Sequence, residues 1–313
     1  TNTETNGFQL LKGSDITFKN GTIRIAKNAN NIKRIIQNYA DLTLEDMHIY
    51  AENQVGGEEY ALSFNFGNIV FKGDTDIITT DDDTAVFDVY FWNNTSYQDG
   101  VSVTFDETYT GTINGTIIYD STDSDKAALI IQGSGYIGAV DTSNSTNNGN
   151  NIKISGGSFG ESVAEYVVDE LNAELNSDGI YTYYETIEEA LEQAEAGDTI
   201  TDLSSQSGDS PEPVQVVTVT YNSNGHGEVP EGHKVTTGTV ITLKDMEDTD
   251  DYAFMGWSIG EETYQPGEIF SVTGNTTFTA VWARKTTPII PSDKVGYIVE
   301  HYLEGRWGYE LED

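Results

Sequence analysis

In Ile16-Thr17-Phe18-Lys19-Asn20-Gly21-Thr22-Ile23-Arg24-Ile25, two short runs of alternating apolar residues flank a Lys-Asn-Gly turn. Alternation with a period of two is typical of β-strands, and asparagine and glycine favour turns. The first run of a similar pair returns at Leu42-Thr43-Leu44 and again at Ile69-Val70-Phe71. Leu42 lies 26 positions after Ile16, and Ile69 lies 27 positions after Leu42. This spacing indicates a repeat array.

The array continues to about residue 160. Further copies stand at Val101-Ser102-Val103, Leu129-Ile130-Ile131 and Ile152-Lys153-Ile154. Periods of about 20–30 residues with two or three short strands indicate a solenoid, because one coil cannot bury its apolar face alone. We predict a mainly β fold with a right-handed parallel β-helix over residues 1–160. An antiparallel sandwich, which also has many short strands, is the alternative.

The last copy carries a resemblance to known proteins. Asn150-Asn151-Ile152-Lys153-Ile154-Ser155-Gly156-Gly157-Ser158-Phe159 resembles coils of β-helix regions in gut-bacterial surface proteins, which have the form VTIxGGTF. The resemblance implies that the array ends close to this segment.

Residues 161–203 are predicted to cap the open end of the solenoid, since its last coil otherwise exposes strand edges and core. Tyr181-Thr182-Tyr183-Tyr184 reads as a strand, and Thr186 with Glu189 forms a capping-box pattern that starts a helix. One face of this small capping helix carries Ile187, Ala190, Leu191 and Ala194. We interpret its acidic opposite face as solvated surface.

Two segments read as linkers, 204–213 (SSQSGDSPEP) and 284–294, because they are polar or proline-containing and lack periodicity. Residues 214–283 between them read as one small β-module. Its parts are the alternating strand 216–221, the turn 222–227, an F-x-GW motif at 254–257 and a closing strand at 276–283.

This order of motifs resembles the InlB B-repeat, also called the Listeria–Bacteroides repeat. The resemblance implies a β-grasp-like spacer or binding module of bacterial surface proteins. We expect Phe254, Trp257, Phe278 and Trp282 to form its core. Residues 295–313 contain Tyr297-Ile298-Val299-Glu300-His301-Tyr302-Leu303, which resembles the first strand of a related surface repeat. We therefore predict the start of a further, truncated repeat and a longer chain with other modules.

Charge and cysteine content narrow the function classes. The 313 residues include 52 acidic and 15 basic side chains, for a net charge of −37. Nucleic acid and anionic membrane surfaces are repelled by such a field. The absence of cysteine excludes disulfides, thiolate zinc sites and cysteine nucleophiles. No apolar run is long enough to span a bilayer, so no membrane insertion is expected. Secretion without disulfides is common in Gram-positive bacteria, which favours an extracellular, cell-surface or cell-wall location.

Acidic residues in one loop suggest a metal site. Asp74, Asp76, Asp81 and Asp83 offer hard oxygen ligands at the short spacing that suits calcium. The order of an EF-hand loop is missing, and a plain polar loop is the alternative. No other cofactor is expected.

Aromatic residues are the candidate ligand contacts. Tyr90, Trp92 and Tyr97 gather in a Thr/Asn-rich region, and exposed aromatic rings often anchor sugars and protein partners. Alternation places Phe87, Val89 and Phe91 on the inward face of a strand and leaves Tyr90 and Trp92 outward.

No catalytic residues are predicted. The carboxylate and histidine patterns of pectin-degrading β-helix enzymes do not occur in residues 1–160. We predict a non-enzymatic, adhesin-like protein that binds a host glycan or a host protein, such as an immunoglobulin or another glycoprotein. A carbohydrate-active β-helix enzyme and a passive spacer are the alternatives.

Overall fold

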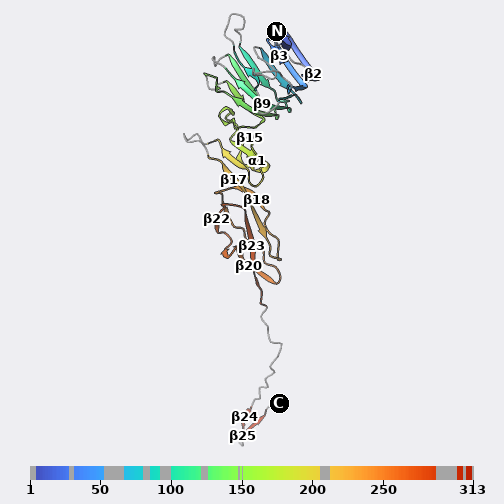
Figure 1. Cartoon of the computed structure of the whole chain (residues 1–313). Coiled ribbons are helices and arrows are strands. Elements are labelled where there is room, and N and C mark those ends of the chain that lie inside the picture. The colour runs from blue at the N-terminus through green and yellow to red at the C-terminus, as the bar shows by residue number, and fades with distance from the viewer. Residues whose placement is uncertain are drawn as a thin grey trace. The chain divides into compact units, whose positions relative to one another are not determined.

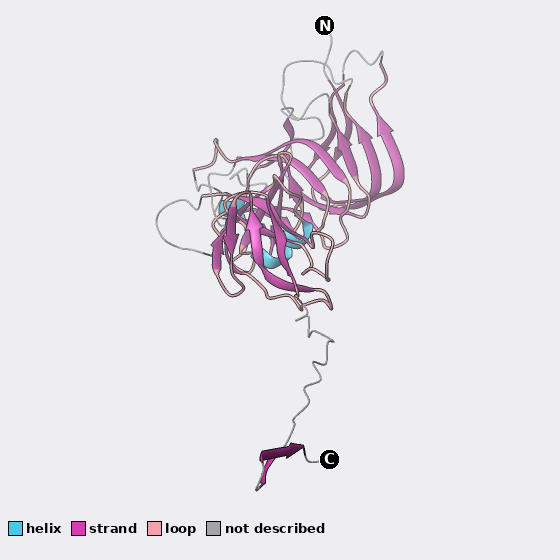
Figure 2. Cartoon of the chain, turned by 90° about the horizontal axis from the view of Figure 1, so that it is seen from below, coloured by secondary structure: helices cyan, strands magenta, loops and turns pink. Residues whose placement is uncertain are grey.

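The computed structural model describes residues 5–27, 32–52, 67–79, 85–91, 100–120, 126–146, 149, 151–204, 212–286, 302–305 and 308–311. These residues are mainly β, with one short α-helix and one 3-10 turn (Figures 1 and 2). Contacts divide the chain into two compact units. Unit 1 is Thr1–Thr220, Glu231–Thr242 and Ile269–Thr277, and unit 2 is Tyr221–Pro230, Leu243–Glu268 and Phe278–Asp313. Neither described helix has the length and apolar character that crossing a bilayer requires.

The first thirteen strands build a parallel β-solenoid of about four turns (blue to green in Figure 1). They are β1 (Thr5–Leu10), β2 (Asp15–Arg24), β3 (Ile32–Asn38), β4 (Asp41–Tyr50), β5 (Asn68–Lys72), β6 (Asp76–Ile78), β7 (Ala85–Val89), β8 (Val101–Phe105), β9 (Thr112–Tyr119), β10 (Ala127–Ile131), β11 (Tyr136–Asp141), β12 (Ile152–Ile154) and β13 (Ser158–Phe159).

The sequence repeat sets the register of this solenoid. Ile16 of β2 pairs with Leu42 of β4, and Leu42 pairs with Ile69 of β5, all in parallel. These are the residues whose spacing indicated the repeat. Parallel pairing continues from β5 to β8, β10 and β12, and a second sheet runs through β6, β9, β11 and β13. The parallel β-helix prediction is therefore confirmed. The pairs among β1 to β13 that the structure describes are parallel, unlike those of an antiparallel sandwich.

Inward-facing side chains of successive rungs form one continuous apolar core. The rings of Phe71 and Phe105 stack with their centroids 4.5 Å apart, and Phe87 stacks on Phe71 at 5.5 Å. All three rings are fully buried. Each rung thus covers the core of its neighbour, as a solenoid requires.

Left-handed backbone marks the corner between the two sheets in three successive rungs. Asn20, Asp46 and Gly73 occupy equivalent positions and have φ values of 54°, 52° and 56°. Asparagine, aspartate and glycine tolerate this region better than other residues. The Lys-Asn-Gly turn of the repeat is therefore a conformational requirement.

Residues 160–204 fold against the last rungs. Their elements are η1 (Ala164–Tyr166), β14 (Ala173–Ser177), β15 (Ile180–Tyr184), α1 (Ile187–Gln193) and β16 (Thr199–Asp202). Strand β15 pairs antiparallel with β13, and Val167 bridges to Ile154 of β12. The hydroxyl of Thr186 accepts a hydrogen bond from the Glu189 amide, 3.2 Å away, so the N-terminal half of the expected capping box forms.

Strands β15, β14, β16 and β17 (Val214–Asn222) form an antiparallel sheet. Helix α1 covers one face of it, where Ala190 and Ala194 pack with Ala173, Ile200 and Val216. The first strand of the predicted module therefore shares a core with residues 161–203.

The remaining strands are β18 (His233–Thr236), β19 (Val240–Thr242), β20 (Tyr252–Ile259), β21 (Glu262–Tyr264), β22 (Ile269–Ser271), β23 (Thr276–Arg284), β24 (Tyr302–Gly305) and β25 (Gly308–Leu311). Antiparallel pairs join β17 to β18, β19 to β22, β20 to β21 and β23, and β24 to β25. In unit 2, Trp257 and Phe278 are fully buried, whereas Phe254 and Trp282 are half-buried. Residues 205–211 and 287–301, which hold most of both predicted linkers, lie outside the described residues.

Candidate functional site

The aromatic candidates are only partly described. Tyr90 follows β7 and is half-buried, while Trp92 and Tyr97 lie outside the described residues. Phe87, Val89 and Phe91 are buried, as alternation predicted. Asp88 is also buried, which alternation did not predict. A register shift against β9 lies between Ala85 and Phe87, and the pairing from Phe87 to Val89 is regular, so the shift does not account for the burial of Asp88.

The acidic loop is likewise divided. Asp74 is exposed, and Asp81 and Asp83 lie outside the described residues. Asp76 already uses both carboxylate oxygens: Oδ2 lies 2.8 Å from Nδ1 of His48, and Oδ1 accepts the Thr112 amide at 2.8 Å. Within the described part of the chain, no three histidine, aspartate or glutamate side chains are grouped as metal ligands.

Some side chains on the outer faces of the solenoid pair between neighbouring rungs. Lys72 pairs with Asp106 at 3.1 Å. The side chain of Asn68 donates to Asp41 at 2.6 Å and accepts the Ser102 amide at 2.8 Å. Two hollows in the described surface offer more enclosed positions for a ligand.

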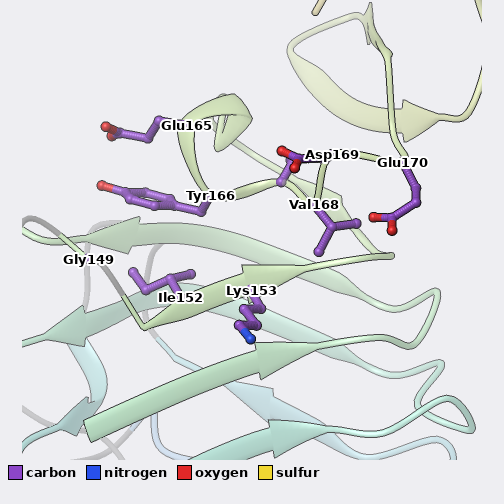
Figure 3. A pocket seen from close by; sticks show the side chains of 9 residues that line it. Gly149, Ile152, Lys153, Glu165, Tyr166, Val168, Asp169 and Glu170 are labelled. Atoms are coloured by element: carbon purple, nitrogen blue, oxygen red, sulfur yellow. The ribbon is translucent and has the colours of Figure 1, made fainter. Parts of the chain in front are cut away.

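A first hollow of about 600 Å³ lies between β12 and the turn η1 (Figure 3). Glu165 and Tyr166 line it from the turn, and Ile152 and Lys153 line it from the strand. In Figure 3 Ile152 lies toward Tyr166, and the Lys153 side chain points away from the turn. The hydroxyl of Tyr166 is 2.9 Å from that of Thr142, and burial is the main cause that raises the pKa of Tyr166. The hollow is open and has exposed charges on its rim.

A second hollow of about 560 Å³ lies on the sheet face opposite α1. Because side chains alternate along a strand, Ala173 and Leu175 of β14 face the helix while Glu174 and Asn176 face the hollow. Two cross-strand rows result, Tyr183–Glu174–Thr201 and Tyr181–Asn176–Thr199. All of these residues except Tyr183 line the hollow, and the rest of the described lining is Ser162, Ala164, Glu165, Leu203 and Pro213.

Glu174 is the best-positioned side chain in this hollow. It is only 7% exposed, and its Oε2 accepts hydrogen bonds from the hydroxyls of Ser162 and, at 2.8 Å, Tyr183. The Tyr183 oxygen in turn accepts the Val163 amide at 2.7 Å. Burial raises the pKa of Tyr183 well above 10, and the Glu174 carboxylate adds to the increase. The network therefore fixes the Glu174 carboxylate in one orientation.

Sequence reasoning did not single out Glu174. The alternation of Ala173, Glu174, Leu175 and Asn176 is a strand signal that could have identified β14 and its polar face. The partnership with Ser162 and Tyr183 has no such signal, since those residues belong to other elements.

Comparisons with protein-family models, with curated proteins and with solved structures found no match to this chain.

Proposed function

We propose that this chain is an adhesin-like binding protein displayed outside a Gram-positive bacterium of the gut type. In this proposal a right-handed β-helix is capped by residues 161–203, and the cap carries a recognition site for a host glycan or a host glycoprotein. Residues 214–283 act as an InlB B-repeat-like module between this region and other surface modules, including the repeat that starts at 295. Binding is non-covalent.

The observation that carries the proposal is the second hollow. It has a preformed floor of paired strands, and a buried, oriented carboxylate stands beside the hydroxyls of Thr199 and Thr201. A few fixed polar groups on a rigid scaffold are typical of a ligand-binding site. The charge of −37 supports an exposed location, because strong net charge keeps a displayed protein soluble.

The test is binding of the labelled 313-residue chain to arrays of host glycans and host glycoproteins. The whole chain is used because Val216 shares a core with Ala173 and Ile200, so a fragment ending at 203 would lose part of its fold. We expect a specific ligand that Glu174→Gln loses and the exposed Glu170→Gln retains. Absence of any ligand across both arrays would favour the spacer alternative.

A carbohydrate-active enzyme is the second candidate, because Glu165 and Glu174 line the same hollow. Glycoside hydrolysis uses two carboxylates about 5–10 Å apart. Release of reducing ends from plant and host polysaccharides, lost in both Glu165→Gln and Glu174→Gln, would support the enzyme. Binding without turnover supports the adhesin.

A further inference from the structure

The second hollow presents acceptors in an acidic setting. Its described lining has two carboxylates, Glu165 and Glu174, and contains no lysine, arginine or histidine. An anionic ligand would be repelled by these carboxylates, whereas a ligand that carries a positive charge would be attracted.

Thr201 provides a second polar group in the lining of the hollow. Thr201 is only 9% exposed, lines the hollow and pairs across β14 and β16 with Glu174. Among the described residues its side chain has no hydrogen-bond partner. The buried side-chain atoms without a partner among the described residues do not include its oxygen, so this hydroxyl is accessible from the hollow and can hydrogen-bond a ligand there.

We propose that the second hollow binds a primary ammonium group. Such a group carries three N–H donors and no acceptor. The donors would meet the Glu174 carboxylate and the Thr201 hydroxyl, the two most deeply buried polar groups of the lining. Since Ser162 and Tyr183 hold Oε2 of Glu174, the carboxylate is oriented before the ligand arrives.

The rim of the hollow suits the remainder of such a ligand. Ala164, Leu203 and Pro213 provide apolar surface beside the polar floor. An alkyl chain or the apolar side of a sugar ring can rest there while the ammonium group reaches inward. The ammonium group can belong to a lysine side chain of a host protein or to an amino sugar of a glycan. The inference rests on the proposed function and names the chemistry of its ligand.

The test uses four probes in pairs and isothermal titration calorimetry of the full chain. Nα-acetyl-lysine amide is compared with Nα-acetyl-norleucine amide, which lacks the ammonium group, and glucosamine is compared with glucose. Salt of about 0.15 M limits the screening length to about 8 Å and suppresses non-specific attraction to the acidic surface. We expect one-to-one binding of at least one amine and none of its neutral partner. The amine that binds identifies the source.

Three variants locate the binding. Glu174→Gln should weaken it roughly tenfold or more, because one charge of a buried pair is removed. Thr201→Val should weaken it several-fold and serves if Glu174→Gln does not fold, while Glu170→Gln should leave it unchanged. Equal binding of an amine and its neutral partner, no amine binding, or amine binding that neither hollow variant weakens would overturn the inference. An array ligand that binds Glu174→Gln normally would leave the proposed function standing without this site.

Discussion

The ammonium group of Lys234, on β18, donates a hydrogen bond to the carbonyl oxygen of Ala194, which ends helix α1. A second bond, 3.0 Å long, reaches the Glu192 carbonyl. The last carbonyls of a helix lack partners within the helix and carry partial negative charge, so a cation there is stabilising. One side chain thus joins β18, in the predicted module, to the helix of the predicted cap.

Lys234→Met should therefore destabilise the protein by about 1–2 kcal/mol, because it removes both hydrogen bonds and the favourable charge at the helix end. Chemical denaturation followed by circular dichroism measures the change. Lys244→Met is the control, since Lys244 is exposed. Equal loss in the two variants would show that the contact contributes nothing specific.

Removal of the hydroxyl should change the free energy of unfolding in opposite directions at Tyr109 and Tyr183. The Tyr109 hydroxyl is buried without a hydrogen-bond partner among the described residues. Tyr109→Phe should thus stabilise the protein by about 1 kcal/mol. Tyr183→Phe should destabilise it by about 1–3 kcal/mol, since the Val163 amide and Glu174 lose their partner. Thermal denaturation of the two variants measures both changes. Destabilisation by Tyr109→Phe would contradict the prediction for Tyr109.

Stability should fall at alkaline pH because of the same two tyrosines. Burial raises the pKa of Tyr183 above its ordinary value, and burial with Asp76 and Asp74 does the same for Tyr109. The folded state therefore holds the phenol protons more tightly than the unfolded chain does. Their contribution is complete below the unfolded pKa of about 10 and is lost as pH rises above it. Urea titrations from pH 8 to 11 should show this slope, reduced in Tyr183→Phe.

Gly111 is expected to tolerate no side chain. A Cβ atom there would lie 2.1 Å from the backbone oxygen of Thr75 on the preceding rung. Gly111→Ala should cost about 3 kcal/mol or more, because rigid backbone must move apart. At Gly274 a Cβ atom would meet nothing within 4 Å. Gly274→Ala should change stability by less than about 1 kcal/mol. Similar free energies of unfolding in the two variants would refute the close approach of the rungs.

The solenoid was predictable because its coils repeat one path. Spacings of 26 and 27 residues in the sequence became the pairs Ile16–Leu42 and Leu42–Ile69. The second hollow was not predictable from the sequence. Glu174 is oriented by Ser162 and Tyr183, which come close to it only through tertiary packing. The linker composition of 204–213 could not show that the strands on either side pair, as β16 and β17 do.

The burial of the first rung has a consequence for how the solenoid loses structure. Ile16, Phe18 and Ile23 of β2 are half-buried, whereas the residues that pair with them on β4 are buried. Rungs contact only their neighbours, so cooperativity runs along one dimension. Amide exchange should start in β2 and advance inward, one rung after another. The solenoid would then unfold in sequence from the rung of β2, and the second hollow, beside β14, would be the last part to lose its structure.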